Sequence, residues 1–166
     1  SGAEPTSTAI AAVSGDALYV VNGEDSSISV VDPVAGTVIG TIALQNVTYP
    51  HHIYLSPDRS KLAVAVPGHD LSGGHSAAAQ GGGEHGAGHG ATTTPTTPAS
   101  GGAVLVLDAT TGATIKSRRL DASNHNAVFS PNGSEIWTAQ LLDAGTVLVL
   151  DAATLDRTAA VLFWDV

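Results

Sequence analysis

Cysteine and methionine are both absent from the 166 residues of this chain. The lack of cysteine excludes disulfides, thiolate nucleophiles and thiolate metal sites, so His, Asp and Glu are left as the strong metal ligands. The lack of an initiator methionine, together with the polar start SGAEPTST, is typical of a terminus left by removal of a signal peptide. We therefore expect an extracytoplasmic protein, either periplasmic, secreted or at the cell surface.

Positive charge is scarce, with six Lys and Arg against fifteen Asp and Glu and a formal net charge of -9. Nucleic-acid binding depends on clustered cations that neutralise phosphates, so we expect no nucleic-acid partner. No apolar run approaches the length of a membrane span, so we also expect no membrane insertion. The acidic balance favours cationic partners, metal ions among them.

The chain contains a threefold internal repeat. In each copy a run of small and β-branched residues (ISVVD, VLVLD, VLVLD) closes on an aspartate that opens a turn, at Asp32, Asp108 and Asp151. A second turn sequence, SGD, SPD or SPNG, precedes another alternating or apolar run in each copy. One copy cannot bury its apolar face alone, so the copies must stack against one another.

The repeat predicts an all-β fold of β-propeller blades. Without one insertion the period is about forty-odd residues, which is the spacing of four-stranded blades. We predict a single β-propeller module over residues 1–166, with three blades of four antiparallel strands each. The blades are expected at about 8–44, about 50–120 and about 124–166.

The innermost strand of each blade is expected to follow a turn at one end of the repeat. We assign it to HHIYLS in the second blade, to HNAVFS in the third and to a weaker AIAAVS in the first. The core is then expected to include Ile53, Leu55, Val128 and Phe129. Trp137 and Trp164 are expected to fill interfaces between blades.

Segments such as YVVNGEDSSISVVDPVAGTVIGTI, HHIYLSPDRSKLAVAV and HNAVFSPNGSEIWTAQ match a known repeat pattern. They resemble the YVTN family of β-propeller repeats, which runs roughly PHGVAVSPDGKRLYVTN and then, after a polar turn, TVSVIDTATNKVVATI. The resemblance covers nearly the whole chain and implies the propeller fold. It does not imply one function, because such repeats occur in surface-layer proteins, in lactonase-like enzymes, and in the propellers that carry the d1 haem of nitrite reductase or face the copper cluster of nitrous oxide reductase.

Three blades do not make a closed ring, since closed propellers usually have four to eight. The chain is therefore expected either to be part of a longer propeller or to complete a ring with itself or with another chain. Two copies would supply six blades.

A long insertion interrupts the second blade at residues 67–102, where a short turn should join two strands. It is rich in Gly, Ala, Ser, Thr and Pro, and it carries four of the seven histidines: His69, His75, His85 and His89. Short His-rich tracts are a known metal-binding composition, although a solvated low-complexity linker can have the same composition. The blade topology predicts that this loop leaves the propeller near His51 and His125.

The other three histidines follow the repeat. Aligning Ser56 with Ser130 places His51 opposite His125, just before the inner strands, with His52 next in sequence. The family pattern has a His at this place, and the resemblance implies an architectural role in which the ring bonds to neighbouring loops. The alternative is that His51, His52 and His125 converge at the channel mouth and bind a metal. Without thiolates, imidazoles favour copper, nickel or zinc.

We therefore interpret the chain as an extracytoplasmic β-propeller binding module rather than an enzyme, and its most specific chemistry as transition-metal binding by histidine. One alternative is a structural or surface interaction scaffold with no metal role. The other is part of a redox propeller that holds a metal or haem. No nucleophile elbow, dinucleotide-binding glycine motif or P-loop occurs in the sequence.

Overall fold

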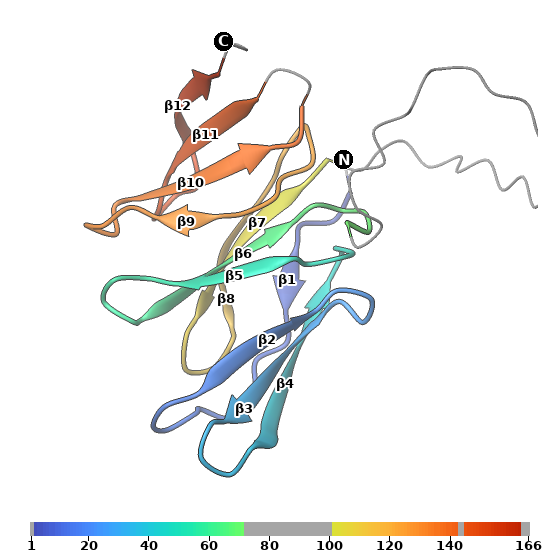
Figure 1. The fold of residues 1–166 in the computed structure, drawn as a ribbon, viewed down its shortest axis with the longest axis vertical. Helices are drawn as coiled ribbons and strands as arrows, with labels where there is room; N and C mark the ends of the chain where they lie inside the picture. The colour runs from blue at the N-terminus through green and yellow to red at the C-terminus, as the bar shows by residue number, and fades with distance from the viewer. Residues whose placement is uncertain (1, 72–100, 143–144, 164–166) are drawn as a thin grey trace, which may run out of the picture.

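The computed structural model describes residues 2–71, 101–142 and 145–163. In these residues it has twelve β-strands and no helix, arranged as three four-stranded sheets that fan out as successive blades (Figure 1). The all-β fold and the three sheets of four antiparallel strands are as predicted. No helix in the described part has the length and apolar character needed to cross a membrane.

Strands follow one another in chain order within the second and third sheets. The second sheet contains β5 (His52–Leu55), β6 (Lys61–Val66), β7 (Ala103–Asp108) and β8 (Thr114–Arg119). The third contains β9 (Val128–Phe129), β10 (Glu135–Gln140), β11 (Thr146–Asp151) and β12 (Arg157–Leu162). In both sheets the first strand lies at one edge and the last at the other, as expected for propeller blades.

The first sheet is built differently. It contains β1 (Thr6–Ser7), β2 (Leu18–Asn22), β3 (Ser27–Asp32) and β4 (Thr37–Gln45), in the spatial order β1-β4-β3-β2. The short strand β1 pairs with the far end of β4, so it extends the outer edge of this blade. The inner edge is formed by β2.

Repeated turns explain why the strands end where they do. One carboxylate oxygen of Asp32, Asp108 or Asp151 accepts hydrogen bonds from the backbone N–H groups two and three residues later. A β-bulge precedes each of these aspartates, between the last two paired strands of the repeat. The prediction that each of the three aspartates opens a turn is confirmed.

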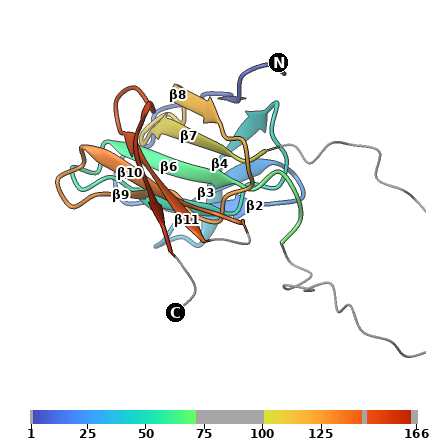
Figure 2. The ribbon, with the colours of Figure 1, turned by 90° about the horizontal axis from the view of Figure 1, so that it is seen from above.

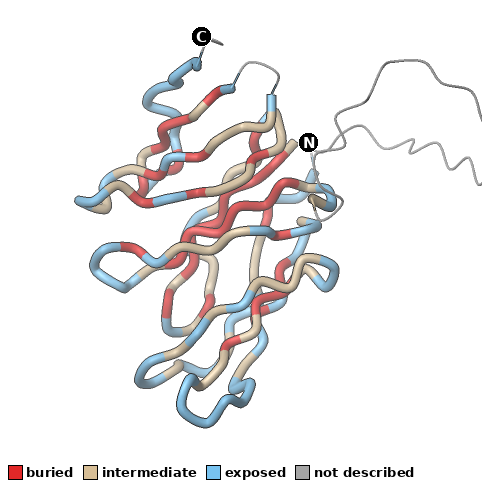
Figure 3. The backbone as a smooth tube through the Cα atoms, viewed as in Figure 1, coloured by how far each residue is buried: buried red, intermediate tan, exposed pale blue. Residues whose placement is uncertain are grey.

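Two apolar layers hold the sheets together. The first layer joins the first and second sheets and includes Ile28, Val30, Leu62 and Val64, all at most 1% exposed. The second layer joins the second and third sheets and includes Ala63, Ala65, Val104, Ile136 and Leu150. Buried residues therefore run through the middle of the stack (Figure 3), and a view turned by 90° shows the sheets overlapping (Figure 2).

The prediction of an inner strand at AIAAVS, residues 9–14, is wrong. This segment forms no strand and instead crosses the turn that joins β7 to β8. The backbone N–H of Ile10 donates to the carbonyl of Thr111 at 2.9 Å, and that of Val13 donates to Thr110 at 2.9 Å. The segment lacks the polar alternation of the other inner strands, and its Ile10 and Val13 side chains are instead partly buried against the first apolar layer.

Two of the four predicted core residues are also wrong. Ile53 packs on the first apolar layer and Phe129 is 9% exposed, but Leu55 is 42% exposed and Val128 is 36% exposed. Leu55 faces the place where the first sheet lacks an inner strand, so a cavity of about 320 Å³ remains there. Val128 lies on the face of the third sheet that no further sheet covers.

Asp108→Ala is expected to lower the free energy of unfolding by about 1–2 kcal/mol at pH 7, because it removes the acceptor for two backbone N–H groups. Hydrogen bonds from Thr110 and Thr111 lower the pKa of this carboxylate to about 2, against an ordinary value of 3.8. The ionised carboxylate therefore stabilises the fold above pH 4, and this contribution disappears as the pH falls through about 2.

Chemical denaturation of the parent and of Asp108→Ala at pH 7 and at pH 2 measures both effects. Asp25→Ala, at an exposed position in the turn between β2 and β3, is the control and should change little. An Asp108→Ala penalty that is as large at pH 2 as at pH 7 would contradict the assigned role.

Candidate metal centre

The repeat places His51 and His125 in the same position of two neighbouring blades. His51 lies just before β5, and its backbone N–H donates to the carbonyl of Ala65 at 2.9 Å. His125 lies before β9, and its backbone N–H donates to the carbonyl of Ala139 at 2.9 Å. The predicted alignment of these two histidines is confirmed by this matching pair of hydrogen bonds.

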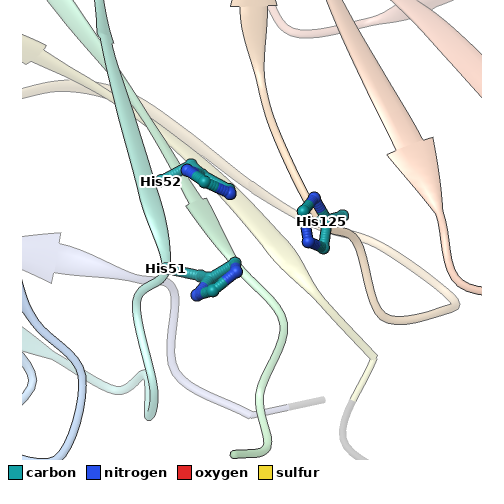
Figure 4. A group of neighbouring side chains, drawn as sticks. All are labelled: His51, His52 and His125. Atoms are coloured by element: carbon teal, nitrogen blue, oxygen red, sulfur yellow. The ribbon is translucent and has the colours of Figure 1, made fainter. Parts of the chain in front are cut away.

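His51, His52 and His125 form one cluster, which we call the histidine triad (Figure 4). One candidate ligand nitrogen from each residue can be chosen so that all three lie within 4.8 Å of one another. The ring centroids are 4.3 Å apart for His51 and His52, and 4.9 Å apart for each of these with His125. The cluster thus bridges the second and third sheets at one end of the inner strands.

Alternation along β5 accounts for the position of His52. Its cross-strand partner is Ala65, which packs in the layer shared with the third sheet, so His52 projects toward that sheet and toward His125. Tyr54 follows on the same side, with its ring centroid 6.0 Å from that of His52. Ile53 projects the other way, onto the layer shared with the first sheet.

The environment favours neutral rings. Partial burial and the neighbouring histidines lower the pKa of His51 below its ordinary value of 6.5, and burial and His125 lower that of His52. Burial disfavours the charged form of an imidazole, and a second positive charge nearby disfavours it further. Since neutral imidazole is the form that binds metal, this arrangement keeps the ligands available at neutral pH.

The ring nitrogens of the triad have no hydrogen-bond partner among the residues that the structure describes. Three imidazoles instead face one another at edge or tilted angles. An architectural histidine of the kind that the family resemblance implies would bond to a neighbouring loop. Such a bond is not seen for the triad in the described residues.

The spacing fits one metal ion after a small adjustment. Nitrogen ligands about 2.0–2.1 Å from a tetrahedral zinc ion lie about 3.3 Å from one another. The candidate nitrogens of the triad lie within 4.8 Å of one another, which is a larger separation than in such a zinc site. Rotation of an imidazole ring moves its nitrogens by about the difference. His52 and His125 are only partly buried, so their rings have room to turn.

Buried Asn124 holds the segment before His125. Its side-chain amide donates to the carbonyl of Ala103 at 3.2 Å and to the hydroxyl of Thr138 at 3.0 Å, joining β7 to β10. A Cβ on Gly102 would lie 2.2 Å from the Asn124 side-chain oxygen, so the close approach requires glycine. Sequence reasoning missed Asn124 because the aligned residue in the second blade is Pro50, so the repeat does not single out this position.

The base of the insertion lies beside the triad, as predicted. His69 lies 3.1 Å from Ser123, measured from its Nδ1 to the serine hydroxyl, two residues before His125. His69 and His51 both line a cavity of about 260 Å³, together with Tyr49. His69 is not a member of the triad. The other proposed loop ligands, His75, His85 and His89, lie outside the described residues.

Tyr49 is a second residue that sequence reasoning missed. Its φ of 56° is in the left-handed region, which a bulky side chain rarely adopts, and it lies two residues before His51. Such conformations persist only where the surrounding structure holds them, and they gather at functional sites. No sequence signal marks it, because Tyr49 precedes Pro50 and proline favours an extended backbone in the preceding residue rather than the left-handed one found here.

Solved structures with similar folds are β-propeller proteins. The chain superposes on a dihydro-heme d1 dehydrogenase, NirN, in complex with DHE, with a TM-score of 0.60, 14% identity and coverage of 96% of this chain and 30% of that one. BamB from Moraxella catarrhalis gives a TM-score of 0.57 at 13% identity and covers 99% and 39%. A putative 6-phosphogluconolactonase from Bacteroides uniformis gives 0.58 at 12% and covers 92% and 39%.

These similarities establish the β-propeller fold and, at such low identity, nothing finer. This chain spans between 30% and 39% of the length of these three structures. No family model matches the chain, and no curated protein sequence matches it. The resemblance to the YVTN family therefore stays a prediction.

Replacement of His125 by Gln is expected to raise the pKa values of His51 and His52 toward 6.5, because it removes one repelling imidazole while keeping a polar side chain of similar size. In the parent protein, both histidines should titrate below 6.5. The measurement is an NMR titration of the imidazole resonances. Parent His51 and His52 midpoints at or above 6.5 would contradict the described geometry.

Proposed function

We propose that this chain is an extracytoplasmic β-propeller binding module in which the histidine triad binds one transition-metal ion. The observation that carries the proposal is the meeting of three imidazoles, with candidate ligand atoms within 4.8 Å, from two different blades. Repetition alone does not require this, because the residue that aligns with His52 in the third blade is Asn126, and the first blade has no strand equivalent to β5 or β9.

The donor set indicates the class of metal. Imidazole nitrogens suit Cu(II), Ni(II) and Zn(II), whereas Ca(II) and Mg(II) prefer oxygen ligands. Three protein ligands leave a coordination position for water or another small ligand, as in open metal sites. The cavity beside His51 provides space next to the cluster. The proposed role is metal binding and presentation within a propeller, without an assigned reaction.

Asn126 illustrates why the site contains three imidazoles rather than four. It occupies the position equivalent to His52, but its side-chain oxygen accepts a hydrogen bond from the backbone N–H of Ala139 at 3.1 Å. Its carbonyl accepts one from the Thr138 hydroxyl. Asn126 is thus used by its own blade, and the second blade supplies two of the three ligands.

Calorimetric titration with Cu(II), Ni(II) or Zn(II) tests the proposal. We expect one ion per chain at the triad, and we expect His125→Ala to weaken this binding at least about tenfold because it removes one of three ligands. His69→Ala is the matched control: it lies beside the cluster but is not a member, and should leave the triad affinity unchanged. A variant lacking residues 72–100 separates binding by the loop histidines from binding at the triad.

Binding should weaken as the pH falls, because protons and metal compete for the same nitrogens. The loss is expected below pH 6.5, since the pKa values of His51 and His52 are lowered. If the parent shows no binding tighter than about millimolar, or if binding is lost only with residues 72–100, the triad proposal fails. The first result would favour the scaffold, and the second a metal-binding loop.

An optical spectrum of the protein purified from its source distinguishes the redox alternative. A bound haem in that material would indicate a redox propeller rather than a metal-binding module. Cell fractionation separately tests the extracytoplasmic location.

A further inference from the structure

Each outer sheet leaves one apolar face uncovered. In this stack a sheet has a trailing face, which packs on the sheet before it in the chain, and a leading face, which packs on the sheet after it. The trailing face of the second sheet and the leading face of the first meet in one apolar layer. The leading face of the second sheet and the trailing face of the third meet in the other. The trailing face of the first sheet and the leading face of the third remain open.

The trailing face of the first sheet carries the repeat positions that are buried in the second. Strand pairing sets Leu18 opposite Val31, just as Leu62 is opposite Leu107, and both pairs stand just before the turn aspartate. Leu62 is 1% exposed, whereas its counterpart Leu18 is 55% exposed. Val20, the counterpart of fully buried Val64, is 48% exposed.

The leading face of the third sheet shows the same pattern. Trp137 pairs with Val128 on one side and with Val149 on the other, so the three side chains form a row across this face. Trp137 is 45% exposed, whereas its counterpart on the second sheet, Ala63, is fully buried. A groove of about 700 Å³ adjoins Val128, Phe129 and Trp137. Trp137 therefore fills no interface between the three described blades, and Trp164, the other tryptophan expected at a blade interface, lies outside the described residues.

The sizes of the side chains on the two open faces compensate for each other. Trp137 on the leading face takes the place that Ala63 has in the second sheet, so volume is added. Ser29 on the trailing face takes the place that Leu105 has, so volume is removed. Ser29 also accepts a hydrogen bond from the side-chain amide of Asn22 at 2.9 Å, so covering this face would bury a polar group that already has a partner.

We propose that the leading face of the third sheet packs on the trailing face of the first sheet of a second copy of this chain, and that the reverse contact closes the pair. The same pairing of leading and trailing faces already joins the three sheets twice within one chain. Two copies give a ring of six blades, within the usual range of four to eight, whereas three copies would give nine. A second copy is favoured because the same pair of faces already packs twice within the chain, and because the side-chain sizes on the two open faces compensate for each other.

Analytical ultracentrifugation of the full chain at micromolar concentration tests this surface. The parent is expected to sediment as a dimer. Trp137→Glu and Val20→Glu each place a charge in both contacts of the ring, and should weaken dimerisation at least about a hundredfold. Val34→Glu is the matched control, because Val34 is 96% exposed in the turn between β3 and β4 and lies on neither face. It should remain dimeric.

A mixing experiment tests the head-to-tail arrangement. Trp137→Glu keeps an intact trailing face and Val20→Glu keeps an intact leading face, so a mixture of the two can form one unaltered contact. We expect fluorescently labelled variants to associate when mixed and not when each is alone. Circular dichroism and melting temperatures confirm that both variants fold, and Trp137→Ala, which adds no charge, provides a second variant of the leading face that should also weaken the dimer.

A parent chain that is monomeric at about 100 µM, a concentration at which even a weak specific pair associates, would overturn the proposal. So would a dimer that persists unchanged in both charged variants, because the contact would then lie elsewhere. Neither result bears on the metal site, whose ligands all come from one chain.

Discussion

The second sheet packs one face on the first sheet and the other on the third, through alternating side chains of β6 and β7. Leu62, Val64 and Leu105 point one way, and Ala63, Ala65 and Val104 point the other, and every one of them is at most 1% exposed. A strand buried on both faces must read as a continuous apolar run, which is what KLAVAV and AVLVLD show. Each outer sheet is held in place by its contact with this one.

That constraint also places the histidines. The inner strand β5 shares the alternation of β6, so His52 must project toward the third sheet if Ile53 is to reach the first apolar layer. His125 joins the cluster because its backbone N–H makes the same hydrogen bond in the third blade that the backbone N–H of His51 makes in the second. The triad is therefore a consequence of strand register and of blade packing. A shift of β5 by one residue would send His52 to the opposite face.

The sequence was sufficient for the fold class, for the turn aspartates and for the alignment of His51 with His125, because each of these depends on local pattern and repetition. It was insufficient at the ends of the stack. AIAAVS has the composition of a strand, but its partners in the turn after β7 lie about a hundred residues away along the chain. Leu55 and Val128 fit the core pattern, but Leu55 faces a first sheet that has no strand equivalent to β5, and no described sheet covers Val128.

The equivalent positions of His51 and His125 could be expected from the repeat, but the state of the rings in the triad could not. The three imidazoles face one another without a protein hydrogen bond among the described residues, and two of them have lowered pKa values. Mutual repulsion would destabilise the cluster whenever two rings were protonated, so in the absence of a shared ligand it adds no evident stability to the fold. A divalent ion bound by the neutral rings would convert this liability into attraction and would tie the second blade to the third. Metal binding at this place would thus strengthen one blade interface directly.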